Sequence, residues 1–199
     1  MSKLYFRYGA MNSGKSTALL QVAYNYEERS QAVLLAKPHI DTKGGDTVVS
    51  RLGMTRQVDF TIPTDGDLRV LFAAARAEKL HSTGLDVACL LIDESQFLTR
   101  EQVDQALKIA VLDGIPVLAY GIRTDFLTNS FPGSLRLFEL AHSIEELKTV
   151  CRCGRKAVFN ARIDNGHFVF EGSQVAIDGV DTSYESLCAG CYLREQVNS

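Results

Sequence analysis

The sequence contains no apolar run that approaches the roughly 20 residues needed to cross a bilayer, which argues against a membrane span. It also lacks an excess of basic residues: the formal net charge is −3, so nothing indicates a nucleic-acid partner or an anionic membrane surface. We find neither internal repeats nor low-complexity segments. Residues 1–3 lead directly into a strand-like segment, so we expect no secretory signal and a cytoplasmic protein.

Cysteine and histidine are both scarce, and the few that occur are unevenly distributed. Four of the five cysteines lie in the last 50 residues, which favours a metal site over disulfides. The histidines show no metal-ligand spacing, and we expect structural or surface roles for them: His39, His81, His142 and His167. With 199 residues, 46% hydrophobic and 23% charged, the chain suits one globular domain with a small appendage.

Apolar strand-like segments alternate with amphipathic helix-like segments over residues 1–149. This order predicts an α/β fold, with a mainly parallel sheet covered by helices on both faces. The expected strands are 3–8, 32–36, 58–62, 87–92, 116–121 and 146–150. The expected helices are 16–29, 67–80, 100–112 and 134–140, with N-caps at Asp67 and Thr99 and with Gly114 just past a helix end.

Two stretches depart from this alternation. Residues 37–55 contain glycine and proline with little periodicity, and we expect a mobile surface loop there. After residue 150 helical periodicity disappears, and Asn165-Gly166 between two strand-like pieces predicts a hairpin. About 50 residues cannot build much of a core, so we expect a second unit, residues 150–199, stabilised by a metal or by the first domain.

A phosphate-binding loop is the clearest motif of the chain. The pattern G-x-x-x-x-G-K-[ST] fits without a mismatch between a strand-like and a helix-like segment, in Gly9-Ala10-Met11-Asn12-Ser13-Gly14-Lys15-Ser16. Its backbone N–H groups can point at phosphate oxygens, Lys15 can reach the outer phosphates, and the Ser16 hydroxyl can ligate Mg²⁺. The first domain is therefore predicted to be a P-loop (RecA-like) nucleotide-binding domain that takes ATP.

An acidic pair follows the apolar strand 87–92 and forms the second nucleotide signal. Asp93 is in the position of a Walker B aspartate that holds Mg²⁺, and Glu94 can take a proton from an attacking hydroxyl or water. Ser95 and Gln96 continue the segment. Water as the acceptor would make the protein an ATPase, whereas a substrate hydroxyl would make it a kinase, and the two motifs leave this open.

Two cysteine pairs form the third constellation. Cys151 and Cys153, together with Cys188 and Cys191, can surround one tetrahedral Zn²⁺, and such an all-thiolate site is normally structural. The alternatives are cysteines packed as small hydrophobes and a redox pair at Cys188 and Cys191. Cys89 lies inside an apolar strand, and we expect it to be an inert core residue.

Together these residues resemble the type II thymidine kinases, in particular their bacterial branch. The resemblance runs over essentially the whole chain and rests on these motifs, on Asp93-Glu94-Ser95-Gln96-Phe97, on the segment Tyr120–Phe126, and on Tyr184 before Cys188. It implies phosphorylation of the thymidine 5′-hydroxyl by ATP to give dTMP in nucleotide salvage, with Glu94 as general base. It also implies a homotetramer and feedback inhibition by dTTP, whereas the expectation of no nucleic-acid or membrane partner comes from the charge and the lack of long apolar runs.

The resemblance further implies a nucleoside site closed by a C-terminal "lasso". Met11 and Phe97 match positions that line the thymine pocket, and Tyr184 matches an aromatic residue that contacts the nucleoside. The lasso segment beside the base would be Gln174, Val175, Ala176, Ile177 and Asp178. Before Tyr184 this chain has one residue more than the family pattern. Met11, Phe97 and Tyr184 could instead be packing residues.

The sequence leaves open the roles of two arginines, and it leaves open two other classes of protein. Arg123 and Arg51 could each bind phosphate or form a surface ion pair. A zinc ribbon on an ATPase core could make a nucleic-acid-stimulated ATPase, although no basic stripe is evident. A nucleotide-gated switch without catalysis is the third hypothesis.

Overall fold

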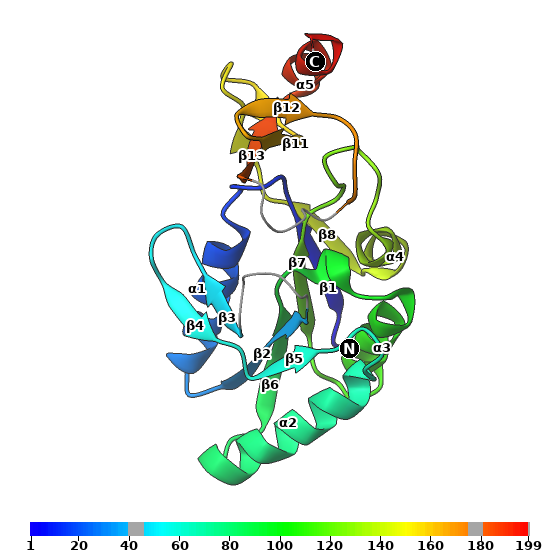
Figure 1. Cartoon of the computed structure of the whole chain (residues 1–199). Coiled ribbons are helices and arrows are strands. Elements are labelled where there is room, and N and C mark those ends of the chain that lie inside the picture. The colour runs from blue at the N-terminus through cyan, green and yellow to red at the C-terminus, as the bar shows by residue number, and fades with distance from the viewer. Residues whose placement is uncertain (40–45, 175–180, 199) are drawn as a thin grey trace.

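The computed structural model describes residues 1–39, 46–174 and 181–198. Its main body is a six-stranded sheet with the order β5-β2-β6-β7-β1-β8, in which every described pair of neighbours is parallel (Figure 1). The strands are β1 (Leu4–Tyr8), β2 (Ala32–Pro38), β5 (Phe60–Ile62), β6 (Val87–Ile92), β7 (Val117–Gly121) and β8 (Ser143–Glu146). The predicted α/β fold is confirmed.

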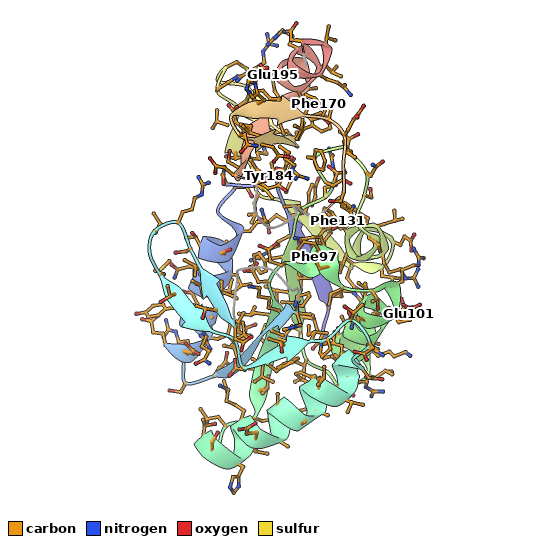
Figure 2. All side chains as sticks on the ribbon, in the orientation of Figure 1. Phe97, Glu101, Phe131, Phe170, Tyr184 and Glu195 are labelled. Atoms are coloured by element: carbon orange, nitrogen blue, oxygen red, sulfur yellow. The ribbon has the colours of Figure 1, made fainter. Side chains whose placement is uncertain are left out.

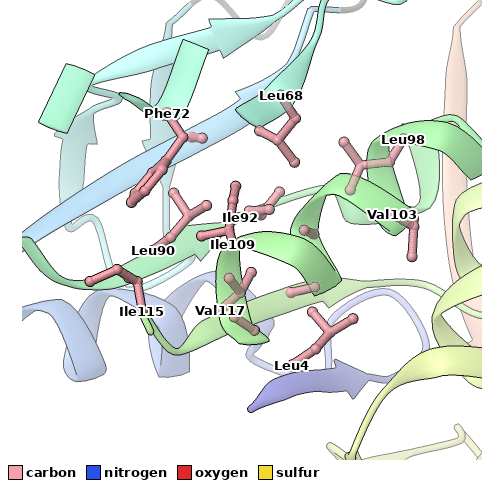
Figure 3. Packing of buried hydrophobic residues seen from close by; sticks show 14 of the residues in the cluster. Leu4, Leu68, Phe72, Leu90, Ile92, Leu98, Val103, Ile109, Ile115 and Val117 are labelled. Carbon is pink, nitrogen blue, oxygen red and sulfur yellow. The ribbon is translucent and has the colours of Figure 1, made fainter. Parts of the chain in front are cut away.

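Helices cover both faces of this sheet, because its strands are apolar on both sides. In β6, Leu90 and Ile92 point into one core cluster, whereas Cys89 and Leu91 point into the other. α1 (Lys15–Glu27) packs into the cluster of Cys89. The opposite cluster, drawn in Figure 3, takes side chains from three further helices: α2 (Leu68–Thr83), α3 (Arg100–Val111) and α4 (Pro132–Leu140).

Cys89 is the core residue that the sequence predicted. Its side chain is fully buried, and burial raises the pKa of its thiol to about 12, so it stays a neutral thiol. The helix ends also follow the prediction. Asp67 accepts hydrogen bonds from the N–H groups of Arg69 and Val70, and Thr99 forms a capping box with Gln102.

The expected strand 146–150 is wrong as a single element. β8 ends at Glu146, and β9 (Thr149–Val150) pairs antiparallel with β10 (Lys156–Ala157) in a different sheet. The chain leaves the main sheet at Leu147, whose N–H donates to the carbonyl of Tyr8, the last residue of β1, at 2.7 Å.

The expected irregular loop 37–55 holds more structure than predicted. β3 (Thr47–Val49) and β4 (Thr55–Gln57) form an antiparallel hairpin closed by the Ser50 N–H, which donates to the Met54 carbonyl at 2.8 Å. Three-residue strands are too short to give a periodic signal, so this hairpin was missed. Residues 40–45 lie outside the described residues.

The C-terminal part is a three-stranded antiparallel sheet with one helix. β11 (Phe159–Asp164) pairs with β12 (His167–Val169) and with β13 (Thr182–Leu187). Asn165 and Gly166 turn the predicted hairpin with φ of 50° and 83°, as a type I′ turn requires. The expectation that helices end before this region is wrong, because α5 (Ala189–Asn198) follows β13. No described helix combines the length and apolar character of a membrane span.

Candidate active site

Three loops meet at the carboxyl edge of the parallel sheet, because β1, β7 and β6 lie side by side and run in the same direction. They border a cleft of about 830 Å³. The C-terminal sheet stands above this edge, and the loop from β1 to α1 reaches up toward it (Figure 1). The cleft is lined by Met11, Asn12, Gly14, Lys15, Ser16, Thr17, Ala18, Gln21, Val49, Arg51, Leu52, Glu94, Ile122 and Tyr184.

The predicted phosphate loop occupies the turn between β1 and α1. Gly9 has no room for a side chain, since a Cβ there would lie 2.4 Å from the Leu147 carbonyl oxygen and from Ser13 Oγ. Asn12 and Gly14 both have positive φ, 67° and 78°, which curls the backbone. The Lys15 ammonium folds back to donate to the carbonyls of Ala10 at 3.0 Å and Gly9 at 3.3 Å.

The loop and the acidic segment converge, as the sequence predicted. Ser16 Oγ donates to Asp93 Oδ2 at 3.4 Å across 77 residues of sequence. Burial and the adjacent Glu94 carboxylate raise the pKa of Asp93, and burial lowers the pKa of Lys15. A hydroxyl beside a buried carboxylate is the oxygen donor set that suits Mg²⁺, and a bound cation would favour the ionised acid.

Glu94 faces the cleft from a strained backbone position. Its φ is 49°, uncommon for a residue with a side chain, and it precedes the short 3₁₀ helix η1 (Ser95–Phe97). Gln96 Nε2 donates to Glu94 Oε2 at 2.5 Å, while Gln96 Oε1 accepts from the Ile122 N–H at 3.2 Å. The buried Gln96 amide therefore ties the carboxylate to the end of β7.

The residues predicted to contact ATP divide into two groups. Five members of the loop and Glu94 line the cleft directly. The other six residues do not line it: Gly9, Ala10, Ser13, Asp93, Ser95 and Gln96. The last three of these are buried. Ser95 Oγ has no hydrogen-bond partner in the described structure, and Gln96 acts on Glu94.

The residues predicted to hold a nucleoside are only partly brought together. Met11 and Tyr184 both line the cleft. Phe97 is half-buried and packs edge-to-face on Phe131, with ring centroids 5.4 Å apart, below Tyr184 in Figure 2. Gln174 donates to Asp125 Oδ2 at 3.0 Å. The other predicted lasso residues lie outside the described residues: Val175, Ala176, Ile177 and Asp178.

Several lining residues were not predicted, and the two open arginines are separated. Val49, Arg51 and Leu52 reach the cleft from the β3–β4 hairpin. Arg123 instead lies over the Phe159 ring, with 5.8 Å between Cζ and the centroid, and does not line the cleft. Because the hairpin left no periodic pattern, only the basic character of Arg51 signalled a role.

The four late cysteines gather as predicted. Their Sγ atoms all lie within 4.8 Å of one another, and Cys153 is 3.6 Å from both Cys151 and Cys188. Sulfurs bound at about 2.3 Å around a tetrahedral Zn²⁺ would stand about 3.8 Å apart, so the cluster can hold such a metal.

The surroundings of the cluster act on its thiols in both directions, because burial raises the pKa of Cys191 to about 11. The backbone N–H of Cys191 is the main cause that lowers the pKa of Cys188. The Arg194 guanidinium donates to Cys191 Sγ at 3.1 Å and places a positive charge beside the sulfurs. These are the outer contacts that a negatively charged four-thiolate metal site needs.

Fold and site together define a P-loop phosphotransferase with an appended cysteine cluster. The thymidine kinase family model matches residues 2–192. The chain belongs to the thymidine kinase family. It is 49% identical over 191 residues to a thymidine kinase of Idiomarina loihiensis, covering 94% of each chain. It is 50% identical to one of Legionella pneumophila strain Lens, over 98% of this chain and 90% of that one, and 44% identical to one of Chromobacterium violaceum. Nothing in these comparisons favours an ATPase acting on nucleic acid.

Proposed function

We propose that this chain transfers the γ-phosphoryl group of ATP to the 5′-hydroxyl of thymidine and releases dTMP and ADP. Membership of the thymidine kinase family indicates that the acceptor of the phosphoryl group is a nucleoside. The single observation that carries the chemistry is the convergence of two loops that are distant in sequence. Lys15, Ser16 and Glu94 line one cleft, and the buried Asp93 accepts a hydrogen bond from Ser16 beside it.

Each of these residues has a separate task. The N–H groups of the loop and the N-terminus of α1 hold the phosphates, and Lys15 leaves its two carbonyl partners to neutralise the transferring group. Glu94 accepts the proton of the 5′-hydroxyl as the new O–P bond forms. Gln96 orients that carboxylate.

Ser16 and Asp93 would hold the Mg²⁺ that accompanies ATP. Both offer oxygen atoms, and they already lie 3.4 Å apart. Bound by these two residues, the ion would neutralise negative charge on the phosphates.

The nucleoside site is assigned to the space between the first domain, residues 1–149, and the C-terminal unit, residues 150–199. Met11 and Tyr184 face the cleft from these two units, and each presents an apolar surface that suits a thymine methyl group. Phe97 and residues 174–178 are assigned to the same site by the family resemblance. Closure over the nucleoside would exclude water from the transferring phosphoryl group.

The remaining assignments rest on the resemblance and on the cysteine geometry. We assign a structural Zn²⁺ to Cys151, Cys153, Cys188 and Cys191, because a four-thiolate site leaves no open coordination position. A homotetramer, feedback inhibition by dTTP and a cytoplasmic location follow from the family resemblance.

An assay with labelled ATP and a panel of nucleosides tests the function. Thymidine, deoxyuridine and deoxycytidine are compared with water alone and with added DNA. We expect thymidine to give the highest initial rate and a labelled monophosphate. ATP hydrolysis that rises with DNA and ignores every nucleoside would replace this proposal, and tight ATP binding with no turnover would indicate a switch protein.

A further inference from the structure

Both backbone polar groups of Met11, in the middle of the phosphate loop, are bound by the C-terminal sheet. The Met11 N–H donates to Asn160 Oδ1 at 2.7 Å. The Met11 carbonyl accepts from the Ser186 hydroxyl. No residue of the first domain supplies either of these two bonds, although the loop belongs to that domain.

The two side chains are placed together by the sheet itself. Asn160 on β11 and Ser186 on β13 are direct cross-strand partners, so they project from the same face of the C-terminal sheet. Only 3% of Asn160 and 6% of Ser186 is exposed. A buried amide and hydroxyl are stable only when they are hydrogen-bonded, and the loop backbone provides the partners.

The Asn160 carboxamide also reaches the loop that follows β7. Its Nδ2 donates to the Thr124 carbonyl at 3.3 Å, so one side chain joins two of the three loops at the carboxyl edge. The phosphate loop is also bound from β9, because Thr149 Oγ1 donates to the Asn12 carbonyl at 3.3 Å. Asn12 is one of the two phosphate-loop residues with positive φ.

This arrangement has a consequence for ATP binding. A phosphate loop binds well only if its N–H groups already point inward, because ordering the backbone on binding costs free energy. We propose that Asn160 and Ser186 are positioning residues that fix the backbone of Met11 and so hold the loop in its ATP-binding conformation. The proposal rests on the assignment of residues 9–16 to ATP.

The strand β13 connects this contact with the phosphate loop to the cysteine cluster. Ser186 lies two residues before Cys188, with Leu187 fully buried between them. A metal that fixes Cys188 therefore also fixes the end of β13 that carries the Ser186 hydroxyl. The cluster then helps to position the phosphate loop, in addition to stabilising the C-terminal unit.

Two variants and two matched controls test the proposal. Ser186→Ala removes one bond, and Asn160→Leu removes two at similar volume. Ser183→Ala makes the serine-to-alanine change on β13 at an exposed position, and Ser186→Thr restores the hydroxyl. ATP binding is measured by calorimetry without thymidine, and amide hydrogen exchange of the peptide that contains Met11 is measured without any nucleotide.

We expect Ser186→Ala to raise the Kd for ATP about three- to tenfold, and Asn160→Leu to raise it at least as much, with faster exchange around Met11 in both. Ser183→Ala and Ser186→Thr should match the wild type. Because both side chains act through Met11, the double variant should lose less affinity than the product of the single effects.

Wild-type exchange and ATP affinity in folded Ser186→Ala and Asn160→Leu would overturn the proposal. If Asn160→Leu does not fold, the comparison of Ser186→Ala with Ser186→Thr decides alone. The exchange measurement needs no ATP, so it stays informative even if the wild-type chain proves not to bind ATP, which would instead refute the proposed function.

Discussion

Glu94 is the residue on which the proposed chemistry depends. Replacing it by glutamine removes the proton acceptor, while the amide oxygen can still accept the Gln96 hydrogen bond. We expect kcat to fall by about 10²- to 10⁴-fold, with ATP affinity close to that of the wild type. Initial rates with thymidine and calorimetric ATP binding measure the two effects.

A charge-matched control for this variant lies on α3. Glu101 is exposed in the first turn of that helix and is labelled in Figure 2 away from Tyr184 and Phe97. Glu101→Gln should leave turnover unchanged. Near-wild-type turnover in Glu94→Gln would remove Glu94 as the base.

Gly121 affects the position of Glu94 indirectly, through the Gln96 side chain. A Cβ at this position would lie 2.8 Å from both Gln96 Oε1 and Ser95 Oγ. Gly121→Ala must therefore displace the amide that orients Glu94. We expect a loss of about 1–3 kcal/mol in the free energy of unfolding, together with a kcat reduced about tenfold or more.

Gly190 gives the matched glycine-to-alanine control for Gly121. A Cβ there would meet no atom closer than 3.9 Å, so Gly190→Ala should preserve both stability and rate. Chemical denaturation and steady-state kinetics measure these changes. A Gly121→Ala protein with unchanged kcat would show that Gln96 does not position the base.

At the scale of elements, the start of α3 tests whether a helix cap predicted from the local sequence contributes to the free energy of unfolding. Thr99 accepts from the Gln102 N–H, and Gln102 accepts in return from the Thr99 N–H. Thr99→Ala should cost about 1 kcal/mol of unfolding free energy with kcat unchanged, because Thr99 caps the helix and does not line the cleft. Thr99→Ser, which keeps the acceptor, should recover most of the loss in the same denaturation experiment.

The same scale shows why some elements were missed. The long helices and the apolar strands repeat their pattern several times and were found within a few residues of their ends. β3, β4 and β9 contain two or three residues, so no period can be read from them. α5 escaped because its start overlaps the second cysteine pair and includes Gly190, a poor helix former.

For the whole molecule, we expect the cysteine cluster to hold the C-terminal unit together through one metal ion. Elemental analysis should find about one zinc per chain. Cys153→Ser should lower both the zinc content and the melting temperature, because metal-binding energy contributes directly to the folding of a small unit. Weaker ATP binding should accompany the loss if β13 presents the phosphate loop.

Cys89→Ala is the cysteine control. It removes a buried thiol from the first domain, so it should lower stability by a cavity effect while the zinc content stays unchanged. A metal-free preparation that is fully stable and active would contradict the zinc assignment.

The sequence by itself determined the class of fold and the main chemical groups. The phosphate loop, the Asp93-Glu94 pair and the cysteine spacing each depend on local order along the chain, and local order can be read directly. The tertiary structure decided what these groups do for one another. Gln96 bound to Glu94, Asn160 and Ser186 bound to Met11, and Arg51 in the cleft depend on strand order and register, and no local pattern encodes these long-range contacts.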